Sequence, residues 1–267
     1  MGRKDRQFVD ALARGLGILE AFSRSSRPLS NGEIAQMARL APSTVSRLTH
    51  TLTVLGYLRF DRNVRRYILT PKNLTLGYPV LAGLSLLDRA RPVLDRLAGE
   101  TGESAALAIL DGLHATFVEV VHGSNLVAVR LATGARLPIA LSAAGLSLLA
   151  GLPEAERRAL AIRVRADLTQ RGGDLDAFDR RLAQACEERV AVVRDAWRRG
   201  IGGVAIALKQ QDQIVSLTIP VATGSISEED MRGRLATMLV EASHYLAADG
   251  APPVARTSER RSAQRVS

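Results

Sequence analysis

Hydrophobic residues recur with helical spacing in the first quarter of the chain. In residues 8–24 they form one stripe, which consists of Val9, Leu12, Leu16, Leu19 and Phe22. Two shorter segments with helical spacing follow at residues 30–38 and 42–55, and only residues 39–41 separate them. The pattern predicts three helices, of which the second and third form a helix-turn-helix.

Start and stop signals mark the ends of these helices. Ser30 followed three residues later by Glu33 has the spacing of a capping box. Pro42 suits the first turn of a helix, where its missing N–H would have no partner. Gly56 occupies the usual position of glycine after the end of a helix.

A basic hairpin completes this part of the chain. Residues 58–69 are interpreted as two short strands with a tip at residues 61–65. We therefore predict a winged helix-turn-helix domain over residues 1–71. A mostly apolar helix is expected at residues 72–87, interrupted near residues 77–79, as a linker to the next domain.

The period of the pattern changes from helix to strand at residue 104, and the second domain is expected over residues 88–249. Asp111-Gly112 is a strong two-residue hairpin signal. Strands are expected at 105–110, 113–121, 126–131, 135–139, 204–208 and 214–219. Helices are expected at 88–99, 142–150, 153–166, 176–194 and 228–248. This order predicts an α+β fold with an antiparallel sheet, in which the two groups of strands form one sheet or two adjoining sheets.

Charge is unevenly distributed along the 267 residues, whose formal net charge is +9. Residues 1–75 carry 13 Lys and Arg against 5 Asp and Glu, whereas residues 76–250 are close to neutral. A basic domain joined to a neutral one is typical of a polyanion-binding module joined to a domain with another task. The tail at residues 250–267 is basic and poor in apolar residues, so we expect it to be disordered.

Composition narrows the class of protein. Hydrophobic residues make up 46% and charged residues 24%, as in soluble globular proteins. No apolar run reaches the roughly 18 residues of a membrane span, and no secretory signal is visible. Cys186 is the only cysteine, which excludes an intrachain disulfide. These features predict a cytoplasmic protein that does not enter the membrane.

The second helix of the helix-turn-helix has a polar face near its N-terminus. In this arrangement we expect Arg47 to contact guanine in the major groove of double-stranded DNA, and Ser43 and Thr44 to anchor phosphates. The full set of expected DNA-binding residues is Ser43, Thr44, Ser46, Arg47, His50, Arg62, Arg65 and Arg66. The last three lie on the hairpin and would enter a minor groove or hold phosphate; the alternative is that they are solvated surface residues.

Several segments resemble the IclR-type transcriptional regulators. They are residues 13–22, 42–48, 55–58, 66–69, 137–145 and 149–153. Residues 7–16, 69–71, 76–78 and 136–138 also resemble the branch that controls aromatic-acid catabolism by the β-ketoadipate pathway. The resemblance implies a GAF-like effector-binding domain, a homodimer or homotetramer, an operator site in DNA and an aromatic carboxylate as small-molecule effector. The apolar stripe of the first helix either forms a contact between two copies of the chain or packs on its own domain; it includes Phe8, Leu12 and Leu16.

The chain departs from the family pattern at three places. Arg65 stands where the family often has glycine in the wing turn. Ile139-Ala140 follow the Leu-Pro of the pocket loop, where a histidine or tyrosine is frequent. Gly203 replaces a frequent cysteine. The last two changes remove polar or reactive groups from the expected pocket.

The expected effector pocket combines a helix N-terminus with residues implied by the resemblance. Free N–H groups at the start of the helix at 142–150 suit a carboxylate. The expected pocket residues are Leu131, Ser142, Ala143, Ala144, Gly145, Asp195, Gly203 and Thr218. Ile109 would add apolar wall, and Arg130 and Arg136 are either counter-charges or surface residues.

We expect no catalytic residues, no metal and no cofactor. The chain has no G-x-S-x-G motif, P-loop or H-E-x-x-H motif. His114, Glu119 and His122 lie on one predicted hairpin and are either metal ligands or surface residues. Two other classes stay open: a DNA-binding protein whose second domain only oligomerises, and an enzyme of the hydrolase or deaminase type.

Overall fold

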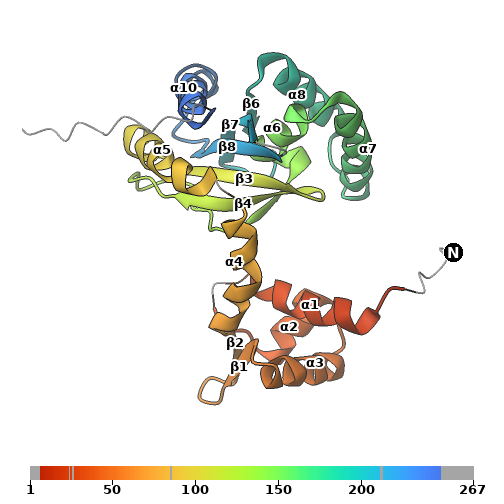
Figure 1. Cartoon of the computed structure of the whole chain (residues 1–267). Helices are drawn as coiled ribbons and strands as arrows, with labels where there is room; N and C mark the ends of the chain where they lie inside the picture. The colour runs from red at the N-terminus through yellow and green to blue at the C-terminus, as the bar shows by residue number, and fades with distance from the viewer. Residues whose placement is uncertain (1–6, 24, 26, 85, 211–212, 248–267) are drawn as a thin grey trace, which may run out of the picture. The chain divides into compact units, whose positions relative to one another are not determined.

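The computed structural model describes residues 7–23, 25, 27–84, 86–210 and 213–247. Its contacts divide the chain after Leu84 into two units. We call the described residues of the first unit the head and those of the second unit the body (Figure 1). The tail expected to be disordered, at residues 250–267, lies outside the described residues.

The head contains the predicted helix-turn-helix and hairpin. Its elements are α1 (Asp10–Ser23), α2 (Asn31–Ala38), α3 (Pro42–Val54), β1 (Leu58–Asp61), β2 (Arg66–Leu69), a 3-10 turn (Pro71–Asn73) and α4 (Leu74–Ala82). Helices α1, α2 and α3 meet around one core, which contains Ile18, Phe22, Leu29, Ile34, Val45, Leu52 and Leu58. The apolar face of each helix supplies this core, and the predicted helix-turn-helix fold is confirmed.

Two left-handed residues end the helices of the helix-turn-helix. Arg39 follows α2 with a φ of 53°, and its N–H donates to the carbonyls of Ala35 and Gln36. Gly56 follows α3 with a φ of 79°, a conformation that glycine adopts without steric cost. The N–H of Tyr57 then donates to the carbonyl of Leu52 at 2.9 Å, which closes the end of α3.

Strands β1 and β2 pair antiparallel and form the wing. Their register places Leu58 opposite Leu69 and Asp61 opposite Arg66, so residues 62–65 form the wing loop. The chain before α2 adds to this pair, because Leu29 and Tyr67 exchange backbone hydrogen bonds of 3.1 and 2.7 Å. The wing is thereby fixed on both sides of β2.

The linker helix differs from the prediction. Helix α4 continues through Pro79 instead of breaking near residues 77–79, and it ends at Ala82. The N–H of the following residue, Gly83, donates to the carbonyl of Pro79 at 3.1 Å. The next helix, α5 (Leu86–Thr101), belongs to the body. Proline removes one hydrogen bond from a helix but does not by itself end it.

The body is an α+β unit, as predicted. After α5 come β3 (Ala105–Asp111), β4 (His114–Val121), β5 (Arg136–Pro138), a 3-10 turn (Ile139–Leu141), α6 (Ala143–Gly151), α7 (Glu154–Gln170), α8 (Leu175–Glu188), β6 (Ala191–Arg194), β7 (Ile201–Gln210), β8 (Gln213–Ala222), α9 (Glu228–Asp230), a π-helical turn (Met231–Leu235) and α10 (Ala236–Ala247). The Asp111-Gly112 hairpin is confirmed, with Gly112 at a φ of 59°.

The strands form a single antiparallel sheet in the order β5-β4-β3-β8-β7-β6. Pairing of β3 with β8, for example Ala106 opposite Thr218, joins the early and late groups of strands. Consecutive residues of β8 are buried, which requires cover on both faces. On one face Ser147 of α6 hydrogen-bonds Ser216 at 2.7 Å. Helices α5 and α10 lie together beside the sheet, away from α6, α7 and α8 (Figure 1).

Two predictions for the body are wrong. Residues 126–131 alternate but form no strand, because β5 occupies the free edge of β4, and Leu126 and Val127 are exposed. The helix predicted at 176–194 ends at Glu188, where Arg189 adopts a φ of 59°. Its last residues form β6 instead, because they pair with β7.

Candidate DNA-binding surface and effector pocket

Helix α3 presents its polar face next to its N-terminus, while its other face is packed in the head. Of the five predicted residues on this helix, Thr44 is half-buried. The other four are exposed: Ser43, Ser46, Arg47 and His50. Arg47 forms no ion pair with a residue that the structure describes. Its guanidinium is therefore available to a ligand outside the head.

The side chain of Asn31, which the sequence analysis missed, hydrogen-bonds the first turns of α3. The amide of Asn31 donates to the carbonyl of Pro42 at 3.2 Å and to the hydroxyl of Ser46 at 3.1 Å. These bonds join the first turn of α2 to the first turns of α3. Ser46 keeps its own hydroxyl hydrogen for donation, so the contact does not exclude it from binding DNA.

The wing loop is ordered by an acid and exposes two arginines. The carboxylate of Asp61 accepts from the N–H of Asn63 at 2.9 Å and of Val64 at 3.4 Å. Arg62 and Arg65 are exposed, and neither is ion-paired within the described part of the head. Arg59 on β1 is exposed as well; alternation along β1 was the signal that would have found it.

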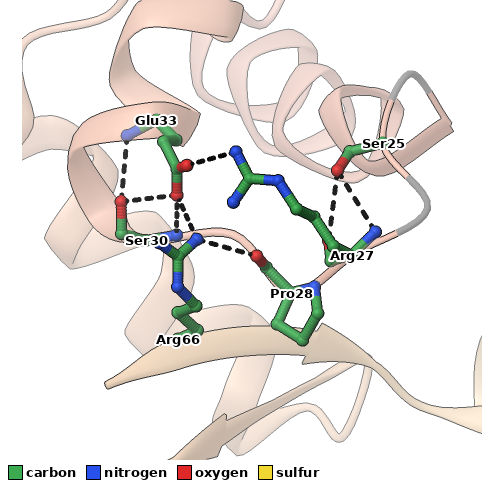
Figure 2. A network of polar contacts seen from close by, with 6 residues as sticks. All are labelled: Ser25, Arg27, Pro28, Ser30, Glu33 and Arg66. Carbon is green, nitrogen blue, oxygen red and sulfur yellow. Dashed lines mark hydrogen bonds and ion pairs between the residues drawn. The ribbon is translucent and has the colours of Figure 1, made fainter. Parts of the chain in front are cut away.

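Arg66 differs from the other predicted wing residues. Its guanidinium donates to the carboxylate of Glu33 at 2.5 Å and to the carbonyl of Pro28 at 3.0 Å (Figure 2). Only a third of its side chain is exposed. The structure therefore gives Arg66 partners inside the head, which the sequence analysis had not foreseen.

The body contains a pocket between α6 and the sheet, with about 430 Å³ of empty space that is partly open to solvent. Six of the eight predicted pocket residues line it: Leu131, Ser142, Ala143, Ala144, Gly203 and Thr218. The apolar side chains that the sequence analysis missed include Phe117, Val129, Leu137, Val193, Trp197 and Ile201. The lining is predominantly apolar, as it is in small-molecule sites.

Polar groups are few in this pocket, and no lining side chain is charged. The hydroxyl of Ser142 donates to the carbonyl of Pro138 and accepts from the N–H of Gly145. The hydroxyl of Thr218 donates to the carbonyl of Val204 at 2.9 Å. The amide hydrogens of Ala143 and Ala144, in the first turn of α6, have no acceptor among the described residues.

Gly145 and Asp195 lie outside the pocket lining. A Cβ on Gly145 would overlap the backbone of Ile139, so this glycine allows α6 to approach the chain before it. Asp195 lies in an open depression with Thr223 and Gly200. The N–H of Gly200, at 2.6 Å, and then the hydroxyl of Thr223, at 2.9 Å, lower the pKa of its carboxyl. Gly145 therefore serves the packing of α6, and Asp195 binds neighbouring loop residues; neither forms part of the pocket wall.

The remaining candidates of the sequence analysis are spread over the body. Arg136 forms an ion pair with Asp111 at 2.7 Å, and Glu119 forms one with Arg91 at 2.6 Å. The pKa of His114 is lowered, first by the burial of its ring and then by the positive charge of Arg136. Ile109 and Arg130 do not line the pocket. Across the described residues, no three His, Cys, Asp or Glu side chains are grouped to hold a metal ion.

Among the described helices, none has both the length and the apolar character that crossing a membrane requires. A winged helix-turn-helix with an exposed polar recognition face, on one chain with an α+β unit that contains an apolar pocket, defines a class: the DNA-binding transcriptional regulators that carry a ligand-binding domain.

The comparisons with known proteins place the chain within this class. Residues 11–62 match the family model described as "IclR helix-turn-helix domain", and residues 79–248 match "Bacterial transcriptional regulator IclR C-terminal". The chain therefore belongs to the IclR family of DNA-binding transcriptional regulators. This assignment confirms the expectation that the protein is a regulator and not an enzyme.

Individual relatives agree with the family assignment. The Pca regulon regulatory protein of Pseudomonas putida is 30% identical over 249 residues, which cover 91% of this chain and 84% of that protein. The crystal structure of an IclR-family regulator from Brucella abortus is 31% identical, with a TM-score of 0.71, over 92% of this chain and 94% of that one. An IclR homologue from Microbacterium hydrocarbonoxydans, solved with 4-hydroxybenzoate, has the same fold at 21% identity and a TM-score of 0.66, over 89% and 97% of the two chains.

Proposed function

We propose that α3 docks in the major groove of an operator and that the wing loop contacts the adjacent backbone. The observation that carries the proposal is the exposed guanidinium of Arg47 near the N-terminus of α3, which has no partner among the residues that the structure describes. In this arrangement Arg47 contacts guanine, Ser43 and Thr44 anchor phosphates, and Ser46 and His50 contact the same groove or its edge. The matched family is one of bacterial regulators, whose DNA lies in the cytoplasm, so we propose that the protein acts there.

The wing contributes positive charge on a short, ordered loop. Arg62 and Arg65 extend from it without partners among the described residues, so both are available for phosphate or a minor groove. Arg66 is not part of this proposal, because Glu33 and Pro28 hold its guanidinium.

We propose that two heads bind one operator through α1. Phe8, Leu12 and Leu16 each expose half or more of their surface, although the other face of α1 is buried in the core. Burying such a stripe against a second copy is favourable, and two heads read a longer site than one. Light scattering tests this: Leu12→Glu with Leu16→Glu is expected to weaken assembly, and unchanged mass at micromolar concentration contradicts it.

The effector that best suits the pocket is a small aromatic carboxylate. Phe117 and Trp197 provide aromatic walls, and the amide hydrogens of Ala143 and Ala144 suit a carboxylate oxygen. The similarity to the Pca regulon regulatory protein and the 4-hydroxybenzoate bound to a homologue support the same class. The apolar lining that α6, the sheet and its loops supply favours this function over a body that only oligomerises.

Effector binding changes operator affinity only if the effector binds two arrangements of the protein unequally. We propose that residues 72–87, which connect the head to the body, transmit this difference. The sign of the response, activation or repression, is an outcome of the assay below.

Operator binding is tested with DNA from upstream of the protein's own gene, by fluorescence anisotropy over a salt series. Arg47→Ala is expected to lose about 1–3 kcal/mol of binding free energy and to relax preference at one base pair. Unchanged affinity removes Arg47 from the interface. A panel of aromatic carboxylates, titrated by calorimetry and into the DNA complex, tests the effector; no heat and no change in affinity for any member refutes that class.

A further inference from the structure

Glu33 is the most heavily hydrogen-bonded carboxylate side chain of the described head, and neither the helix-turn-helix nor the wing explains all of its contacts. One oxygen accepts from the guanidinium of Arg27 at 2.7 Å. The other accepts from the N–H and the hydroxyl of Ser30, each at 2.8 Å, and from Arg66 at 2.5 Å. Figure 2 shows the carboxylate between these donors. The backbone N–H of Ser30, then its hydroxyl, then Arg27 lower the pKa of Glu33 to about 2.

These bonds join two segments that are far apart in the sequence, residues 27–33 and the start of β2. Glu33 lies in the first turn of α2, and Ser30 caps that helix. Arg66 is the first residue of β2, directly after the wing loop. It also donates to the carbonyl of Pro28, and the neighbouring residues Leu29 and Tyr67 exchange backbone hydrogen bonds. The carboxylate of Glu33 therefore attaches the foot of the wing to the helix-turn-helix, in addition to the bonds that Pro28 and Leu29 accept or exchange with β2.

The sign of the charge makes this arrangement unusual for a DNA-binding head. A carboxylate near DNA repels phosphate, and an arginine that it holds is withdrawn from phosphate binding. A capping box accepts glutamine as well as glutamate at this position. The helix cap alone therefore does not require the negative charge, whereas the bonds from Arg27 and Arg66 are strengthened by it.

We propose that Glu33 is a positioning residue for the wing: by holding Arg66 it fixes the foot of the loop, so that Arg62 and Arg65 reach the DNA backbone while Arg66 does not. The proposal rests on the DNA-binding surface proposed above. It assigns the three wing arginines to two roles, with Arg66 as an internal tie and Arg62 and Arg65 as contacts to DNA.

Glu33→Gln separates a positioning role from a simple effect of charge, because the two predict opposite changes in operator affinity. Removing a negative charge from the head by itself favours DNA binding. Glutamine keeps one acceptor oxygen but loses the charge that strengthens the bond from Arg66, and this weaker tie is expected instead to weaken operator binding roughly three- to tenfold. The matched control is Glu20→Gln, which removes an exposed carboxylate from α1 that has no hydrogen-bond or ion-pair partner among the described residues. Its operator affinity is expected to stay the same or rise.

A double-mutant cycle distinguishes positioning from general destabilisation. Arg65→Gln, introduced alone, is expected to weaken operator binding. The fold loss that it causes is expected to be at least twofold smaller when Glu33→Gln is already present, because the loop is no longer held in place. If Glu33 contributes only to stability, Arg65→Gln reduces operator affinity by the same factor with and without Glu33→Gln. Circular dichroism at the assay temperature verifies that each variant is folded.

Arg66→Gln provides a second route if Glu33→Gln does not fold. It is expected to weaken binding while leaving the slope of log K against log salt unchanged, since no phosphate contact is lost. A phosphate contact would lower the slope by about 0.9 per head.

Three results overturn the proposal: tighter or unchanged binding by Glu33→Gln, full additivity in the cycle, or a lower salt slope for Arg66→Gln. If the native protein binds its operator and Arg65→Gln weakens that binding, these results refute only the role of Glu33. If the native protein does not bind, the DNA-binding surface itself is refuted.

Discussion

Replacing Arg65 with glycine is expected to stabilise the head and to weaken DNA binding at the same time. Arg65 has a φ of 52°, in the left-handed region where a side chain is strained. That conformation costs a residue other than glycine about 1–2 kcal/mol. Glycine removes the strain but adds freedom to the unfolded chain, which costs about 0.4–1 kcal/mol. The expected net gain in the free energy of unfolding is about 0.5–1 kcal/mol.

The same change removes a cation from the wing loop. For one phosphate contact, the slope of log K against log salt falls by about 0.9 per head, so a symmetric operator with two heads loses about 1.8. Affinity for the operator is therefore expected to fall most at low salt, although the protein is more stable. Stability and binding move in opposite directions only if Arg65 is both strained and in contact with DNA.

The matched control is Arg62→Gly, which removes the same charge from the same loop. Arg62 is not among the residues with positive φ, so glycine relieves no strain there and is expected to destabilise the head by about 0.4–1 kcal/mol. Urea unfolding is followed by far-ultraviolet circular dichroism. Fluorescence of Trp197, the single tryptophan, reports the body separately. Equal destabilisation by both variants refutes the strain argument, and an unchanged salt slope for Arg65→Gly refutes the phosphate contact.

Three further predictions concern the pocket, the packing of α6 and the response to acid. Gly203→Val directs a side chain toward Ala143, whose Cβ would lie 3.5 Å from the new Cβ; effector binding in calorimetry is expected to be lost while operator affinity is retained, and retained binding contradicts the pocket. Gly145→Ala forces the backbone of Ile139 aside and is expected to destabilise the body by about 1–3 kcal/mol in urea unfolding, whereas native stability would show that the chain yields freely. Because the folded-state pKa of Glu33 is about 2 against a usual 4.5, its contribution to stability is complete above pH 4.5 and is lost as the pH falls toward 2. Acid unfolding of the head in Glu33→Gln is expected to depend less steeply on pH across that window, and identical profiles contradict the assignment.

The head could be predicted from the sequence because its signals are local. The capping box of Ser30 and Glu33, the proline at the start of α3 and the glycine after it each act within a few residues. The exposed face of α3 follows from the helical period alone, and with it the accessibility of Arg47. The domain class and the IclR family were therefore evident before the structure.

The tertiary structure decided which residues meet across long stretches of chain. Residues 126–131 have a strand pattern without a strand, because another segment occupies the edge of β4, whereas residues 191–194 became β6 because β7 offered an edge. Phe117 and Trp197 share a pocket only through the order of the sheet and its loops. Arg66 was predicted to bind phosphate, but a carboxylate 33 positions away accepts its hydrogen bond. Helix caps and periodicity depend on neighbours along the chain, whereas strand pairing, pocket walls and ion pairs depend on neighbours in space, which become defined only when the core packs.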